Sequence, residues 1–204
     1  MKAPRSDFAG WKRMTRALFT LIWILTLGTP ASARLPDFDS LWNYKDPGAT
    51  EQKFRALLPA AESSDDPGYH AELLTQLARS LGLERQFDSA HHLLDEVKPM
   101  LANLGPRPRV RYLLERGRTL NSSGRAAEAA PLFREAWDLA NSNKLDFFAI
   151  DAAHMLAIVA PTDEQMGWNI KTVRIAETSS DPKAVRWLGS LQNNMDWAYF
   201  DQRK

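Results

Sequence analysis

The 204-residue sequence contains no cysteine. No disulfide can therefore stabilise the fold, and the absence of thiols is compatible with an oxidising compartment. A lipid anchor of the bacterial lipoprotein type, which needs a cysteine directly after the leader, is excluded, and so is a cysteine nucleophile. Stability must come from packed secondary structure, and the chain is long enough to bury a core.

Hydrophobic runs long enough to cross a bilayer are also missing. The uncharged apolar stretch ALFTLIWILTL, at residues 17–27, is shorter than the roughly 20 residues that a membrane-spanning helix needs. It follows basic residues and precedes a small-x-small sequence that ends at Ala33, an order typical of export signals. We therefore expect residues 1–33 to be a cleavable signal peptide and the protein to be periplasmic or secreted. The alternative is an uncleaved leader, which would be the only contact with a membrane.

The sequence has no large excess of one charge sign and no familiar catalytic motif. Its formal net charge is +1, and residues 1–33 carry five Lys or Arg and one acid, so the mature chain would have a net charge of −3. Nucleic-acid binding, which requires a basic surface, is not expected. The sequence also has no GxSxG, no HExxH and no glycine-rich phosphate loop. We expect neither enzymatic activity nor a cofactor.

Two segments of the chain repeat one pattern of small and large residues. They are ARSLGLERQFDSAHHLL, from Ala78, and RGRTLNSSGRAAEAAPLFREA, from Arg116. In each segment a small residue, Ala78 or Gly117, is followed three residues later by leucine and nine further on by alanine. Small residues at such positions allow the two helices of a hairpin to pack closely.

This pattern resembles the tetratricopeptide repeat, here in a protein of the exported bacterial type. The resemblance implies an all-α fold, namely a right-handed superhelical solenoid of antiparallel helix hairpins with about four to five repeats in residues 34–204. A related array of helical hairpins is the alternative. The clearest units are residues 69–101 and 109–140, and the weaker units are residues 39–62, 146–178 and 182–204.

Apolar spacing and helix breakers predict the individual helices. Outside unit 109–140, the expected helices are residues 49–58, 69–81, 87–98, 146–159, 163–177 and 182–200. Pro59 should help to close the first of these, and Pro131 should either delay or bend the second helix of unit 109–140. Thr162 should cap the helix that follows it. The core-facing residues expected in helix 163–177 include Met166, Ile170 and Val173.

The resemblance also implies a binding face for a protein or peptide partner. In such a solenoid the first helix of each unit lines the concave face, and residues one turn apart point into the groove. Guanidinium groups match carboxylates, and side-chain amides can pair with a peptide backbone. The alternative is that the residues on this face are solvated and paired with Glu72, Glu115 or Asp151. The candidate ligand-binding residues are Arg79, Arg111, Arg118, Asn121, Asp151, Asn193 and Trp197.

Two other functional hypotheses remain open. The first is self-association through the C-terminal helix, which would make the protein a structural subunit of an envelope assembly. We expect this helix either to end the array or to lack its partner helix because the sequence stops within a repeat. The second is a metal-dependent activity at His91 and His92, which precede Asp95 and Glu96 by one turn, the spacing of helical metal ligands. Adjacent histidines point about 100° apart on a helix, so a solvated surface without a metal is the preferred interpretation.

Overall fold

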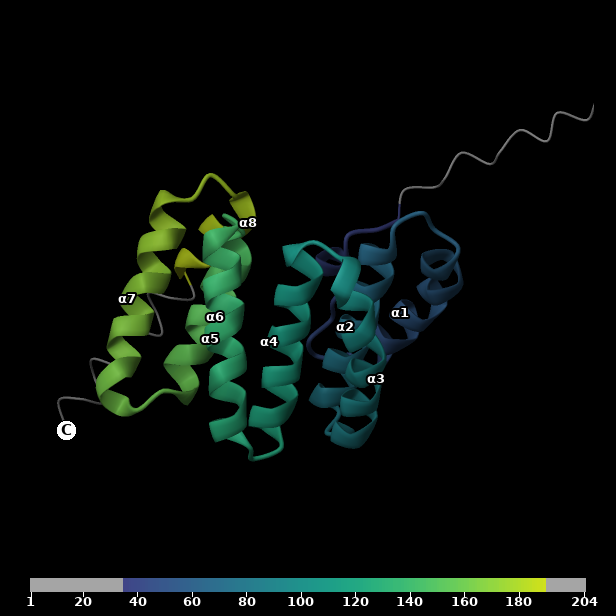
Figure 1. Cartoon of the computed structure of the whole chain (residues 1–204), viewed down its shortest axis with the longest axis horizontal. Coiled ribbons are helices and arrows are strands. Elements are labelled where there is room, and N and C mark those ends of the chain that lie inside the picture. The colour runs from purple at the N-terminus through teal and green to yellow at the C-terminus, as the bar shows by residue number, and fades with distance from the viewer. Residues whose placement is uncertain (1–34, 190–204) are drawn as a thin grey trace, which may run out of the picture. The chain divides into compact units, whose positions relative to one another are not determined.

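The computed structural model describes residues 35–189, and this part of the chain contains α-helices, two 3₁₀-helices and no β-strand (Figure 1). The all-α prediction is therefore confirmed. The expected signal peptide and the end of the last expected helix lie outside the described residues. The helices are α1 (Pro47–Glu62), α2 (Pro67–Leu83), α3 (Phe87–Met100), α4 (Pro106–Ser122), α5 (Ala126–Ser142), α6 (Asp146–Val159), α7 (Thr162–Thr178) and α8 (Pro182–Val185), with η1 (Phe38–Ser40) and η2 (Leu101–Asn103) as 3₁₀-helices.

Helices α2, α4 and α6 form an inner layer. Each helix from α1 to α7 packs against the next one along the chain, and α4 also packs against both α2 and α6. The three inner helices bury side chains around most of their circumference, whereas α3, α5 and α7 bury a narrow stripe. A helix that is buried on all sides must be covered by neighbours on more than one face. Figure 1 shows α4 between α1, α2 and α3 on one side and α5, α6 and α7 on the other.

A glycine sets the distance between α4 and α5. A Cβ atom placed on Gly117 would lie 2.5 Å from Cε1 and 2.8 Å from Cζ of Phe133. Phe133 is fully buried on α5. The small residue that defines the repeat pattern therefore has the expected physical role, because any larger side chain would collide with this ring.

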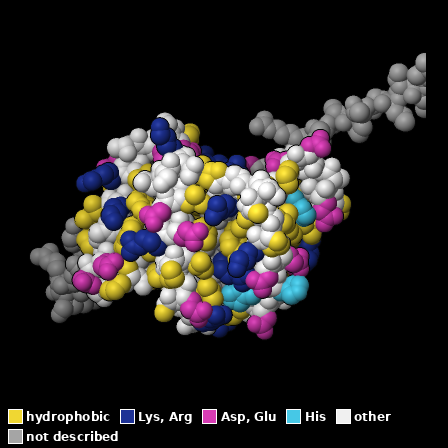
Figure 2. All heavy atoms as spheres, viewed as in Figure 1, with side chains coloured by type: hydrophobic (Ala, Val, Ile, Leu, Met, Phe, Trp, Pro, Cys, Tyr) yellow, Lys and Arg dark blue, Asp and Glu magenta, His cyan; other side chains and the backbone are white. Residues whose placement is uncertain are grey.

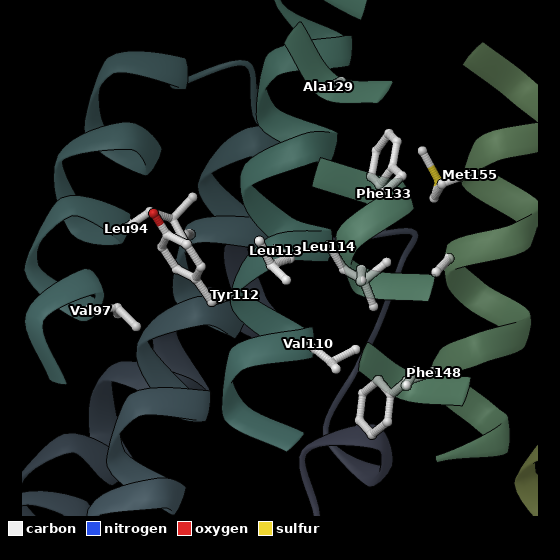
Figure 3. Close-up of a cluster of buried hydrophobic side chains, with 14 of the residues drawn as sticks. Leu94, Val97, Val110, Tyr112, Leu113, Leu114, Ala129, Phe133, Phe148 and Met155 are labelled. Carbon is white, nitrogen blue, oxygen red and sulfur yellow. The ribbon is translucent and has the colours of Figure 1, made fainter. Parts of the chain in front are cut away.

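One hydrophobic core cluster includes buried residues of every helix from α1 to α7. Figure 3 shows Leu94 and Val97 of α3 with Tyr112 of α4 on one side, and Phe133 with Met155 of α6 on the other. Apolar residues spaced one turn apart on helices α2 to α5 are buried. They are Leu74, Leu77, Leu81, Ala90, Leu94, Val97, Leu113, Leu120, Ala129, Phe133 and Ala136.

The same turn closes α2, α4 and α5. Its middle residue has a positive φ of 63° at Arg85, 85° at Gly124 and 54° at Lys144. In each case the next backbone N–H donates to a carbonyl oxygen in the last turn of the helix, as in a Schellman motif. These bonds join Gln86 to Leu81 at 2.9 Å, Arg125 to Leu120 at 2.9 Å, and Leu145 to Ala140 at 3.0 Å.

Several predicted helix boundaries are wrong. Helix α1 continues past Pro59 to Glu62, because Ala61 is buried and tertiary packing outweighs the local preference. Pro131 lies inside α5, which begins at Ala126 and is therefore not delayed. Thr162 is the first residue of α7 and does not cap it, since no side chain caps this helix. The expected helix 182–200 is interrupted, because α8 ends at Val185 and a turn follows.

The buried face of α7 also differs from the prediction. Trp168, Thr172 and Ala176 are buried, whereas Ile170 has an exposed fraction of 44%. The Trp168 ring packs edge-on against Trp137 of α5, with ring centroids 5.4 Å apart. Burial of this indole, the largest side chain in the helix, sets the rotation of α7.

The N-terminal segment, residues 35–46, covers part of the inner layer. Phe38 is fully buried against Tyr69 of α2, with ring centroids 4.6 Å apart. The Trp42 indole N–H donates to Oε1 of Gln76, also on α2, at 2.9 Å. Lys183 of α8 donates to carboxylate oxygens of Asp37 and Asp39, both at 2.6 Å. The segment is thus held by α2 and α8.

Candidate functional site

The N-terminal segment and the inner layer enclose a cavity of about 290 Å³. Its volume is roughly twice that of an apolar cavity of about 150 Å³ that holds benzene. A wider depression of about 340 Å³ adjoins it and shares Asp39, Tyr44, Phe147 and Trp187. The cavity lining consists of Asp39, Trp42, Tyr44, Gln76, Arg79, Arg111, Leu114, Glu115, Phe147, Phe148, Asp151 and Trp187.

Aromatic side chains line two sides of this cavity. On the side of α2, the rings of Trp42 and Tyr44 stack with centroids 4.9 Å apart and an interplanar angle of 4°. The guanidinium carbon of Arg79 lies 5.5 Å from each ring centroid, within cation–π range. On the side of α6, Phe147 packs against Trp187 with centroids 6.4 Å apart. Helix α4 lies between α2 and α6 and supplies the floor.

A network of buried charges crosses the floor from α2 to α6. Oε1 of Glu115 accepts hydrogen bonds from Arg79 at 3.1 Å and from Arg118 at 2.8 Å. Arg118 also donates to Asp151 of α6. The other oxygen of Glu115, Oε2, is buried and has no hydrogen-bond partner among the described residues. The side chain of Glu115 is only 3% exposed.

A second branch of the network joins α2, α4 and the N-terminal segment. Oε2 of Glu72 accepts a hydrogen bond from Nε of Arg107 at 3.1 Å. Nε of Arg111 lies 2.9 Å from the same oxygen, but its N–H is not aimed at it, so the pair is an ion pair without a hydrogen bond. The Arg111 guanidinium also lies 4.0 Å from Asp39 and over the Phe148 ring. Carboxylates and guanidinium groups therefore alternate along the network.

Burial and pairing shift the pKa values of this network in opposite directions. Burial alone would lower the pKa of Arg118 and raise that of Asp151, but their mutual attraction reverses both shifts, so the Arg118 pKa is raised and the Asp151 pKa is lowered. Burial raises the pKa of Glu72, and the attraction of Arg111 and Arg107 only partly offsets it. The folded structure therefore favours the ionised forms of Arg118 and Asp151, whereas it disfavours the ionised form of Glu72.

The structure brings some of the predicted site residues together and separates others. Arg79, Arg111 and Asp151 line the cavity. Arg118 lies beside it and lines a neighbouring cavity of about 150 Å³. Asn121 is partly exposed near the end of α4 and lines neither cavity. Asn193 and Trp197 lie outside the described residues, as does most of the C-terminal helix expected to support self-association.

The arginines of the predicted site are not free for a partner's carboxylate. Each of Arg79, Arg111 and Arg118 is within ion-pair distance of at least one carboxylate of this chain. The alternative interpretation, in which these arginines are solvated and paired with carboxylates of this chain, is correct about the pairing. It is wrong about the solvation of Arg111 and Asp151, because both are buried. The burial follows from the position of α4 between α2 and α6.

The adjacent histidines point to different partners. Nδ1 of His91 lies 2.8 Å from Nη1 of Arg116, and Nδ1 of His92 lies 3.0 Å from Glu96. Burial and the nearby Arg116 lower the pKa of His91. Within residues 35–189, no three His, Asp or Glu side chains are placed to hold one metal ion.

The sequence prediction missed the aromatic residues of the cavity. Trp42, Tyr44 and Phe147 are brought together by long-range packing, which sequence spacing does not show. The sequence feature that could have indicated these cavity residues is the high density of aromatic residues before the first helix, in LPDFDSLWNY. Such a cluster in a segment without helical periodicity indicates side chains that pack on another element.

Comparison with known proteins provides no family assignment, since no protein-family model, curated protein or solved structure matches the chain. None of the helices in residues 35–189 has the length and hydrophobicity to span a membrane. Acidic and basic side chains are interspersed over the face shown in Figure 2.

Proposed function

We propose that the protein is an exported, non-catalytic scaffold of the tetratricopeptide type, periplasmic or secreted, which binds a peptide or protein segment on the inner layer. Three features support a solenoid of hairpins. Consecutive helices pack in chain order, the inner helices lie side by side, and the same turn follows α2, α4 and α5. The role of Gly117 against Phe133 supports the repeat assignment.

The cavity between the N-terminal segment and the inner layer is the observation that carries the binding proposal. Sites for ligands are concave, mostly apolar and provided with a few well-placed polar groups. The cavity combines aromatic walls with the polar groups of Gln76, Arg79 and Glu115. In this proposal Arg79 contacts the partner, and Arg118 and Asp151 position Glu115.

Selection from a displayed library of random peptides on the purified protein tests this function. We expect selected peptides to lose most of their affinity when Tyr44, which is 61% exposed at the cavity, is changed to alanine. The Ile170→Ala variant, changed at an exposed position of α7, is the control and should bind normally. If no peptide is enriched, or if the two variants bind equally well, the proposed function is wrong.

A further inference from the structure

The depression of about 340 Å³ that adjoins the cavity exposes aromatic rings to solvent. Tyr44 is 61% exposed, and Phe147 and Trp187 are half-buried. All three side chains line the depression. Clustered apolar side chains at the surface, rimmed by polar groups, often mark the place where another molecule binds. A side chain that enters the depression can therefore contact several accessible rings.

Arg186 is the cation of the depression that has no ion-pair partner among residues 35–189. It follows the last residue of α8, is exposed, and donates from Nε to the carbonyl oxygen of Pro182 at 3.3 Å. The other cation of the lining, Lys183, is paired with Asp37 and Asp39. An anionic group in the depression can therefore pair with Arg186 without displacing a carboxylate of the described chain.

The N-terminal segment shows how this region holds an extended stretch of chain. Its buried Phe38 has the guanidinium carbon of Arg111 5.4 Å from the ring centroid. The acids on either side of this ring, Asp37 and Asp39, both pair with Lys183 of α8. The depression begins beside this contact, since Asp39 and Lys183 also line it. An aromatic side chain flanked by carboxylates is thus the chemistry that the region already accepts from its own chain.

The charge and volume of the depression favour a second group of the same kind. Its lining contains two cations and one acid, so a basic segment would bind less well than an acidic one. Aromatic rings attract a further ring in edge-to-face or offset stacking. A volume of about 340 Å³ lies at the small end of the range for ligand pockets and has room for one aromatic side chain.

We propose that the depression binds a partner peptide in which an aromatic residue stands next to an acidic residue. The ring packs against Tyr44, Phe147 and Trp187, and the neighbouring carboxylate pairs with Arg186. This inference rests on the proposed function and specifies the chemistry that the partner must present.

Three short peptides, acetylated and amidated at their ends, separate the contribution of the ring from that of the charge. We expect Asp-Phe-Asp to bind the purified full-length protein with a Kd of a few millimolar in a ligand-detected NMR titration. Asn-Phe-Asn keeps the ring and the shape but lacks the charges, and it should bind about threefold more weakly, as the loss of one exposed ion pair predicts. Asp-Ala-Asp lacks the ring and should not bind measurably at the same concentrations.

Three variants at exposed positions locate the binding. Arg186→Gln should weaken Asp-Phe-Asp about threefold and leave Asn-Phe-Asn unchanged, so that the two peptides then bind equally. Tyr44→Ala should weaken both peptides about fivefold. Arg174→Gln is the matched control, because Arg174 is an exposed arginine of α7 that lines neither the depression nor the cavity, and it should change no Kd.

The outcomes distinguish this inference from the proposed function. A preference for Asp-Phe-Asp that persists in Arg186→Gln, or that Arg174→Gln removes equally well, would overturn the role of Arg186. Dimerisation in sedimentation runs that Arg186→Gln abolishes would place a second copy of the chain in the depression, and the partner peptide would be wrong. If library peptides bind through Tyr44 but are insensitive to Arg186→Gln, this inference is wrong and the proposed function stands. If no peptide of either kind binds, both are wrong.

Discussion

The packing of Gly117 against Phe133 allows a quantitative test of the hairpin. In a Gly117→Ala variant the new Cβ would lie 2.5, 2.8 and 2.9 Å from three atoms of a buried ring. Overpacking of this kind costs about 1–3 kcal/mol, and contact with three ring atoms places the cost near 3 kcal/mol. Alanine regains about 1 kcal/mol of helix propensity. We expect a net loss of about 2 kcal/mol in the free energy of unfolding, or about 4–8 °C in Tm.

Another glycine inside a long helix is a matched control. Gly167 lies within α7, and a Cβ placed there meets no other atom within 4 Å. Gly167→Ala should therefore stabilise the protein by about 0.5–1 kcal/mol, through helix propensity alone. Urea and thermal unfolding followed by circular dichroism at 222 nm would measure both variants. If Gly117→Ala were as stabilising as Gly167→Ala, the steric role of this glycine would be refuted.

Two further predictions concern the charge network and a turn. In urea unfolding at pH 7, Asp151→Asn should destabilise the protein by about 3 kcal/mol, whereas Glu72→Gln should change its stability by less than about 1 kcal/mol. Because the pKa of Asp151 is lowered in the folded protein, the destabilisation by Asp151→Asn should decrease as the pH drops below about 3.8. Equal destabilisation by the two variants at pH 7 would contradict the opposite pKa shifts of Asp151 and Glu72. Lys144→Gly should stabilise the protein by about 0.5–1 kcal/mol in thermal unfolding, because φ is positive there; an equal gain with Lys144→Ala would refute this.

The sequence was informative where the signal was local. The spacing of Gly117, Leu120 and Ala129 identified a hairpin because close packing of two helices requires small residues at fixed positions. Helix 146–159 was predicted with its observed boundaries, since a largely apolar stretch begins with an acid and ends before Pro161. Fold class and helix order follow from such local patterns.

The cavity depends on contacts that have no fixed spacing in the sequence. Tyr44 and Phe147 are about a hundred residues apart and meet only because the N-terminal segment crosses the inner layer. The unpaired oxygen of Glu115 depends on the exact direction of two guanidinium groups. The predicted buried face of α7 was wrong for a related reason. The burial of Trp168 depends on packing against another helix and not on the apolar spacing within α7.

The charge network restricts how the inner helices can pair. Helix α2 presents Glu72 and, two turns later, Arg79, and α4 presents Arg111 and Glu115 opposite them. A slip of α4 by one turn would put Glu115 in the place of Arg111, and two buried carboxylates would then face each other. Like charges in a buried site are strongly unfavourable. Buried ion pairs add little net stability compared with apolar packing, so we expect their main effect here to be on the register of α2 and α4, and with it on the position of Glu115 at the cavity.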